Sequence, residues 1–193
     1  MSALPKHREK IIRAAAKLFR QSGYAATGIN EIAALSKAPK GSLYHYFPAG
    51  KEEIAEAALR YAGALVRDTL ADLAAKHERP EAMLRAYAKL LAGWMRASDF
   101  ADGCPVATTL LELAPASADI AAAGAQILGE WAGVFAAALV GAGASPERAA
   151  RLGSLAIAAL EGALVIARVE RSERAILGAA EEVAGLFESA TRG

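Results

Sequence analysis

Apolar residues recur at helical spacing near the start of the chain. Five of them fall on one face of a helix between residues 6 and 21, namely Ile11, Ile12, Ala15, Leu18 and Phe19. Ser22 and Gly23 follow, and a glycine at this point supplies the left-handed stop that commonly ends a helix. The pattern predicts an amphipathic first helix that ends at this pair.

Two shorter helices are predicted after this stop. Thr27 is a good N-cap for the first of them, whose apolar residues point inward. A short break at residues 36–38 precedes Pro39, which suits the start of the second helix because no donated N–H is needed there. Residues 48–50 end that helix. Two short helices joined by a tight turn, after a longer amphipathic one, are the parts of a helix-turn-helix.

Long helices rich in alanine and leucine are predicted for the rest of the chain. Proline, glycine and polar breakers divide them, and no repeat or strand-like alternation interrupts them. The predicted ranges are 51–76, 80–97, 104–113, 117–141, 146–170 and 172–190. We therefore expect an all-α fold of about nine helices. Residues 1–50 would form a three-helix DNA-binding domain, with its helix-turn-helix motif at about residues 28–47, and residues 51–193 a C-terminal helical domain.

The composition favours a cytoplasmic location. The single cysteine, Cys104, excludes an internal disulfide framework and fits a reducing compartment. The first residues contain no apolar segment of a secretory signal. The longest uncharged stretch, residues 131–146, is too short and too rich in glycine to span a bilayer comfortably. We expect a soluble protein without a membrane partner.

The net charge of +1 conceals an uneven distribution along the chain. Residues 1–51 hold nine lysines and arginines against two acids, a net charge of +7, whereas the remainder carries −6. A basic head on a mildly acidic body is typical of a domain that meets a polyanion. A solvated charged face is the simpler alternative, so the charge alone does not decide between them.

The predicted third helix concentrates groups that can bind nucleic acid. Leu43 lies four residues before Phe47, so both can anchor the helix to the first two, and the polar groups then point outward. Lys40 and Ser42 stand at the helix start, where free N–H groups favour phosphate, and Gly41 lets the backbone approach DNA closely.

Two further residues extend this surface. Tyr44 can offer its ring to a thymine methyl group and its hydroxyl to a phosphate or a base edge, and Lys51 is placed for another phosphate. The alternative is that the aromatic residues of the third helix only pack. It leaves unexplained why three adjacent polar ring-bearing residues share a short basic helix.

Residues 23–33 (GYAATGINEIA), followed by APKGSLYHYFPAGKEEI, closely resemble the DNA-binding motif of TetR-family regulators over roughly residues 8–56. The resemblance implies phosphate contacts from Thr27, Lys40, Tyr46 and Lys51. It implies base or phosphate contacts from Gly41, Ser42, Tyr44 and His45. The extra residue before Lys51 in FPAGK and the later GCPV at residues 103–106 are similar to a subgroup of drug-responsive repressors that includes lincomycin-resistance regulators.

The same resemblance implies a homodimeric repressor that a small apolar or drug-like ligand releases from a palindromic operator. The last two long helices would form the dimer interface. Small residues there would let helices approach closely in a four-helix bundle, although each can equally face a neighbour inside the subunit. They are Gly153, Ala156, Ala159, Ala163 and Ala167.

A ligand pocket in the C-terminal domain needs apolar walls and a few polar groups. The candidate wall residues, each of which can also be plain core, are Trp94, Met95, Leu111, Trp131 and Phe135. Glu161 lies in an apolar run, where a carboxylate needs a partner. It can anchor a cationic or hydroxylated ligand or pair with an arginine across the dimer, and we slightly favour the ion pair.

Enzyme functions fit the sequence poorly. The three histidines, His7, His45 and His77, are scattered, and no metal-binding, phosphate-loop or nucleophile motif occurs. Cys104 is expected to be a structural thiol, with redox sensing as a minor alternative. We expect no catalytic residue, metal or cofactor. Two other functions stay open: a small helical enzyme using the C-terminal cavity, and an architectural DNA-binding protein without ligand control.

Overall fold

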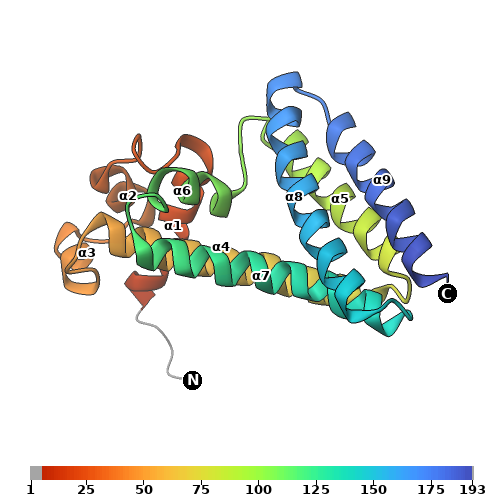
Figure 1. Cartoon of the computed structure of the whole chain (residues 1–193). Helices are drawn as coiled ribbons and strands as arrows, with labels where there is room; N and C mark the ends of the chain where they lie inside the picture. Colours follow the sequence, from red (N-terminus) through yellow and green to blue (C-terminus); the bar gives the residue numbers. More distant parts are fainter. Residues whose placement is uncertain (1–5, 193) are drawn as a thin grey trace. The chain divides into compact units, whose positions relative to one another are not determined.

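The computed structural model describes residues 6–192, which form nine α-helices and no β-strand. The predicted all-α fold is therefore confirmed (Figure 1). Each helix found by its spacing is present, with most boundaries within a residue or two of the predicted ones. The helices are α1 (Lys6–Ser22), α2 (Ile29–Ser36), α3 (Lys40–Tyr46), α4 (Lys51–Lys76), α5 (Pro80–Ala97), α6 (Pro105–Leu113), α7 (Ala118–Gly141), α8 (Pro146–Glu170) and α9 (Arg174–Thr191).

The helices divide into two compact units. The first unit contains residues up to 64 together with residues 104–125, and the second contains residues 65–103 and 126 onward. Helices α1, α2, α3 and α6 belong to the first unit, and α5, α8 and α9 to the second. Helices α4 and α7 each contribute to both. The sequence predicted a division into two continuous segments at residue 50. In the structure, α6 lies far along the chain from the helix-turn-helix but packs in the same unit.

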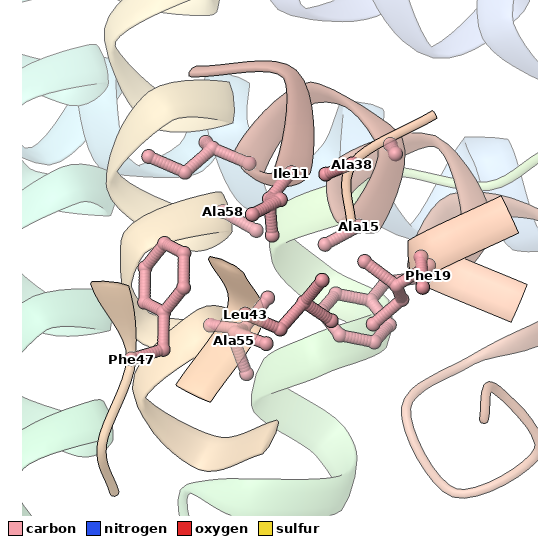
Figure 2. Packing of buried hydrophobic residues seen from close by; sticks show 13 residues of the cluster. Ile11, Ala15, Phe19, Ala38, Leu43, Phe47, Ala55 and Ala58 are labelled. Atoms are coloured by element: carbon pink, nitrogen blue, oxygen red, sulfur yellow. The ribbon is translucent and has the colours of Figure 1, made fainter. Parts of the chain in front are cut away.

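One apolar core holds the first unit together. Phe19 of α1, Ile32 of α2 and Leu43 of α3 are at most 1% exposed and pack in a single cluster. Phe47, immediately after α3, is fully buried in the same cluster, and Ala55 joins it from α4. Figure 2 shows these side chains converging between the helices. Leu43 and Phe47 are thus the anchors of α3 that their spacing predicted.

The start of α2 differs from the prediction. The N-cap is Gly28 rather than Thr27, and the carboxylate of Glu31 accepts a hydrogen bond from the Gly28 backbone N–H at 2.6 Å. The Thr27 hydroxyl donates to the carbonyl oxygen of Gly23 at 2.7 Å, and Thr27 lies one residue before the cap. Gly23 has a φ of +81°, the left-handed conformation expected after α1.

Aromatic side chains form the centre of the second unit. The ring of Phe135 on α7 lies 6.3 Å from that of Tyr87 on α5 and 6.0 Å from that of Phe187 on α9, measured between centroids. Trp131 is 1% exposed. These separations fit the edge-to-face and tilted packing that aromatic rings prefer.

The small residues of α8 mostly pack inside the subunit. A Cβ atom at Gly153 would lie 2.4 Å from the carbonyl oxygen of Ala132, so α8 and α7 touch through their backbones there. Ala156, Ala163 and Ala167 are at most 3% exposed in the isolated subunit. Of the two alternatives for these residues, the structure selects contact within the subunit; only Ala159 among the five is partly exposed.

Helices α7 and α8 each contain an 18-residue stretch that is apolar enough to cross a membrane. Within the structure, 33% and 44% of these two stretches are buried. Core helices of soluble proteins have the same length and composition, so the two helices by themselves are weak support for a membrane protein.

Candidate nucleic-acid interface

Helix α3 separates its apolar anchors from its polar groups. Leu43 is 1% exposed and faces the core, whereas the next residue, Tyr44, is 60% exposed. Lys40, Gly41 and His45 are also exposed. Ser42 and Tyr46 are half-buried. Six of the eight predicted DNA-contacting residues therefore lie together on this one short helix, and the side chains of Lys40, Tyr44 and His45 are exposed.

Two ring contacts order the side chains around α3. The imidazole of His45 meets the ring of Tyr46 edge-on, with 4.9 Å between centroids. The guanidinium of Arg8 on α1 lies 5.2 Å from the centroid of the Phe47 ring. A cation over an aromatic face is attracted by the ring quadrupole. Arg8 thereby adds a positive charge beside the end of α3.

Lys51, the first residue of α4, lies against the turn between α1 and α2. Its Nζ is 4.1 Å from the centroid of the Tyr24 ring and 3.5 Å from the Ala25 carbonyl oxygen. Burial lowers the pKa of the Lys51 ammonium, although the nearby carboxylates of Glu112 and Glu31 act in the opposite direction. The amine that the sequence assigns to a phosphate is thus held by a ring instead of extending into solvent.

Thr27 differs from the other predicted contacts. Its side chain is 1% exposed and its hydroxyl is engaged by Gly23. Its backbone N–H donates to the carbonyl oxygen of Tyr24 at 3.1 Å. Neither group is open to a phosphate in this arrangement. The structure gives Thr27 a role in shaping the turn before α2.

Glu112 on α6 contacts the turn between α1 and α2, and the sequence gives no signal for this contact. Its carboxylate accepts hydrogen bonds from the backbone N–H groups of Tyr24, at 2.8 Å, and Ala25, at 2.6 Å. The partners are 88 and 87 positions apart along the chain. Only the packing of α6 on α1 brings them together.

The six predicted ligand-binding residues differ in burial and in the unit to which they belong. Met95, Trp131 and Phe135 are buried in the second unit, at 3%, 1% and 0% exposure. Trp94 is 47% exposed, and Leu111 belongs to the first unit and is 78% exposed. Glu161 is partly buried.

The second unit does contain a groove, elsewhere on its surface. It has a volume of about 650 Å³ and lies between α4 and α7. Its lining mixes small apolar residues of both helices with Arg67, His77, Glu78 and Glu130. The guanidinium of Arg67 lies 3.5 Å from the Glu130 carboxylate. None of the six predicted ligand-binding residues lines it.

The last two helices expose aliphatic side chains that no residue of the subunit covers. Val165 is 62% exposed and Val169 is 79% exposed, and both lie on α8. Helical spacing puts four exposed residues on one side of α8, and we call them the aliphatic face: Leu155, Val165, Ile166 and Val169. Leu177 and Leu186 are also exposed, on α9. Within residues 6–192, no group of three or more histidine, cysteine or carboxylate side chains is arranged to hold a metal ion.

Comparisons with known families divide the chain in two. Residues 11–58 match the family "Bacterial regulatory proteins, tetR family". Residues 80–182 match "Transcriptional regulator LmrA/YxaF-like, C-terminal domain". The two matches cover the helix-turn-helix and most of the helices beyond it.

Whole-chain relatives and solved structures agree with these matches. The chain is 33% identical over 183 residues to the HTH-type transcriptional regulator YxaF of Bacillus subtilis, covering 95% of this chain and 96% of the relative. It is 32% identical to the HTH-type transcriptional regulator LmrA of the same organism, covering 88% and 90%. A TetR transcriptional regulator from Legionella pneumophila superposes with a TM-score of 0.83 at 18% identity, over 96% and 99% of the chains. Another from Chloroflexus aurantiacus gives 0.75 at 28% identity, over 94% of each chain.

Proposed function

Because the chain belongs to the TetR family of DNA-binding transcriptional regulators, with an LmrA/YxaF-like C-terminal domain, we propose that it is a repressor which a small molecule releases from its operator. Its relatives are regulators of transcription and not enzymes. The proposed place of action is the cytoplasm, where the DNA lies.

The observation that carries this proposal is the two-sided character of α3. Buried Leu43 and Phe47 fix the helix in the core, while exposed Lys40, Tyr44 and His45 offer a cation, a phenol and an imidazole to a partner. A short helix with polar groups on one side fits the major groove, where base edges present hydrogen-bonding groups. Lys40 contacts phosphate in this proposal, and Tyr44 reads a base.

A palindromic operator requires two copies of α3, and we propose that the aliphatic face joins two subunits. A contiguous exposed surface of aliphatic side chains is unfavourable in water and commonly marks a protein interface. The same surface on each subunit gives a closed two-fold dimer. Ala159 lies at the partly exposed side of α8, whereas the other small residues serve the subunit interior.

For the ligand, the groove between α4 and α7 is the better-formed site. Its volume of about 650 Å³ is in the range of small-molecule pockets, and its apolar floor meets a few charged groups at the edge. An apolar or drug-like molecule would bury its hydrocarbon against the alanines. The buried residues Met95, Trp131 and Phe135 would then support the groove from the core of the second unit. The proposed release is a population shift, because the ligand favours a subunit shape that no longer fits both half-sites.

One experiment tests repression directly. The protein is used to select duplexes from a randomised library, and the best sequence is placed over a promoter transcribed in vitro. We expect a palindromic selected site, and transcription that falls as protein is added. An architectural protein would bind the selected and random duplexes with equal affinity. Equal affinities would therefore contradict the proposal.

A second experiment tests release. Both tryptophans, Trp94 and Trp131, lie in the second unit, so their fluorescence reports binding there without a signal from α3. A library of apolar drug-like compounds is screened for quenching, with free protein and with protein on the selected duplex. We expect affinities that differ by about 5- to 150-fold, a coupling of roughly 1–3 kcal/mol. A compound bound equally tightly by both forms would show that its site is not a switch.

A further inference from the structure

The turn between α1 and α2 is contacted by two charged residues of other helices, Glu112 of α6 and Lys51 of α4. We propose that Glu112 on α6 is a positioning residue for DNA binding, which holds this turn through its two adjacent backbone N–H groups. The proposal rests on the DNA-binding function of the first unit. It assigns part of that function to a helix outside the helix-turn-helix motif.

The geometry of the contact is specific to a carboxylate. One oxygen of Glu112 accepts from the Tyr24 N–H at 2.8 Å and the other from the Ala25 N–H at 2.6 Å. Hydrogen bonds to an ionised acceptor are shorter and stronger than those between neutral groups. A glutamine has a single carbonyl oxygen and would place an N–H donor against one of the two backbone donors. An aspartate is one methylene shorter.

Gly23 independently shows how closely the carboxylate approaches the turn. A Cβ atom at residue 23 would lie 2.4 Å from Oε1 of Glu112, closer than atoms can come. The φ of +81° at the same residue also disfavours a side chain. The glycine thus ends α1 and leaves the space that the Glu112 carboxylate occupies.

Lys51 closes the other side of the turn. Its ammonium lies over the Tyr24 ring at 4.1 Å and near the Ala25 carbonyl oxygen at 3.5 Å. The N–H groups of Tyr24 and Ala25 therefore meet an anion from α6, while the ring and a carbonyl of the same residues meet a cation from α4. We call this arrangement the turn clamp, formed by Glu112, Lys51, Tyr24 and Ala25.

The turn clamp orders groups that DNA contacts require. The turn leads directly into Thr27 and the Gly28 cap of α2, and α2 packs on α3 through Ile32 and the shared core. Lys51 itself is a proposed phosphate contact. A binding surface that is already ordered before association loses less conformational freedom on binding and so binds more tightly. Without Glu112, the turn and the start of α2 would have to be ordered at the moment DNA binds.

The test compares Glu112→Ala, Glu112→Gln and a matched control, Glu147→Gln. Glu147 is an exposed glutamate in the first turn of α8, so its replacement removes the same charge far along the chain from the turn. Affinities are measured for the duplex that the unaltered protein selects and for a random duplex of equal length. Removing an acid makes the protein more basic, so electrostatics alone predicts unchanged or tighter binding to both duplexes.

The turn clamp predicts the opposite for the selected duplex. We expect roughly 10-fold weaker binding for Glu112→Ala, and a smaller loss for Glu112→Gln, which keeps one acceptor. Binding to the random duplex should not weaken in either variant, and Glu147→Gln should match the unaltered protein. Hydrogen exchange at the Tyr24 and Ala25 amides, measured without DNA, should accelerate in both Glu112 variants while amides within α1 stay protected.

The outcomes separate the turn clamp from the DNA-binding proposal. Unchanged affinity of both Glu112 variants for the selected duplex would overturn the positioning role. Faster exchange throughout α1 and α2 would also overturn it, because Glu112 would then serve general stability. If the unaltered protein selected no sequence, the repressor proposal would fail, while the exchange of the Tyr24 and Ala25 amides would still test whether Glu112 holds the turn.

Discussion

Helices α3 and α8 both expose side chains to solvent, but of opposite chemistry. On α3 the exposed side chains include Tyr44, which is 60% exposed and ends in a hydroxyl, together with Lys40 and His45. On α8 the exposed side chains include Val165, Ile166 and Val169, which have no polar atom. Each helix therefore exposes the groups that suit a different kind of partner.

The difference shows how a sequence whose apolar residues are mostly alanine and leucine can serve two kinds of binding. Exposure of polar groups to water costs little free energy, so the polar side of α3 can remain exposed when no DNA is bound. The aliphatic face of α8 gains about 25 cal/mol for each square ångström it buries, so its burial in a lasting protein contact is favoured. DNA binding and self-association are thus separable by mutation, in the following order of expected effect.

The largest effect is expected from Val165→Glu. One carboxylate from each subunit would be buried in the proposed interface, at a cost of several kcal/mol, so subunit association should weaken by more than about 100-fold. Operator binding should fall with it, while circular dichroism keeps the helical signal. Sedimentation velocity measures the association state. Val140→Glu, at a 44% exposed valine on α7, is the matched control and should remain dimeric.

A dimer that persists in Val165→Glu would place the interface elsewhere. Glutamate at Ala163 would not be a clean test, because that alanine is 3% exposed inside the subunit and the change would disturb its core. Unaltered protein that sediments as a monomer at micromolar concentration would contradict the proposed interface altogether.

The next effect is expected from Tyr44→Ala, which removes the proposed base contact of α3. Specific affinity should fall by about 1–3 kcal/mol, with preference relaxed at one position of each half-site. The side chain is 60% exposed, so the melting temperature should stay close to that of the unaltered protein. Fluorescence anisotropy with single-base variants of the selected duplex measures the change. An equal loss on all variants would show that Tyr44 contacts only the backbone.

A smaller and more uniform effect is expected from Lys40→Ala. Lys40 is exposed at the first position of α3, where its charge can reach a phosphate. Its removal should weaken binding to selected and random duplexes alike, and lower the salt dependence of the logarithm of affinity by about one unit per subunit. Titrations at several salt concentrations measure this slope. An unchanged slope would remove Lys40 from the set of phosphate contacts.

The smallest effect is expected from Arg85→Ala in the second unit, and it depends on pH. Arg85 on α5 contacts the carboxylates of Glu181 at 2.8 Å and Glu188 at 3.0 Å on α9. Its hydrogen bond lowers the pKa of the Glu181 carboxyl in the folded protein. The ion pair therefore stabilises the fold above the usual glutamate pKa of about 4.3, and this contribution disappears as the pH falls through the lowered folded value.

Denaturation of the two proteins by urea checks this dependence. At pH 7 the Arg85→Ala variant should unfold at a slightly lower urea concentration than the unaltered protein, and the difference should shrink on acidification below the glutamate pKa. Because the carboxylate of Glu181 is largely exposed, the pair is expected to contribute little. A difference that is the same at both pH values would mean that Arg85 stabilises the fold by packing and not by charge.

Features that depend on neighbouring residues could be predicted from the sequence. Helical spacing and the glycine and proline breakers act within a few positions, and they located all nine helices of the described residues. The same local logic found the anchors Leu43 and Phe47. It missed the cap of α2, because the helix begins one residue later than expected, after Gly28, whose N–H donates to the Glu31 carboxylate.

Features that depend on distant packing could not be predicted. Spacing indicates which face of α8 is buried, but not whether it packs against its own subunit or another, and Gly153 proves to contact Ala132. The large apolar residues suggested a pocket wall, and Trp131 and Phe135 are buried in the second unit, at 1% and 0% exposure. The groove is lined mostly by small residues, which carry no distinctive signal. Nothing in the sequence around Glu112 indicates its contact with Tyr24, which lies 88 positions away along the chain.

The aliphatic face also affects the subunit concentration at which the operator becomes occupied. If two subunits must meet before either α3 can hold its half-site, the amount of active dimer varies with the square of the subunit concentration whenever most subunits are monomers. Operator occupancy then rises over a narrower range of expression than for a monomeric regulator. A change that weakens the contacts of Val165 or Val169 would shift that threshold upward while leaving the recognised sequence the same. The subunit concentration needed for operator occupancy and the operator sequence that is recognised would thus be set by different helices.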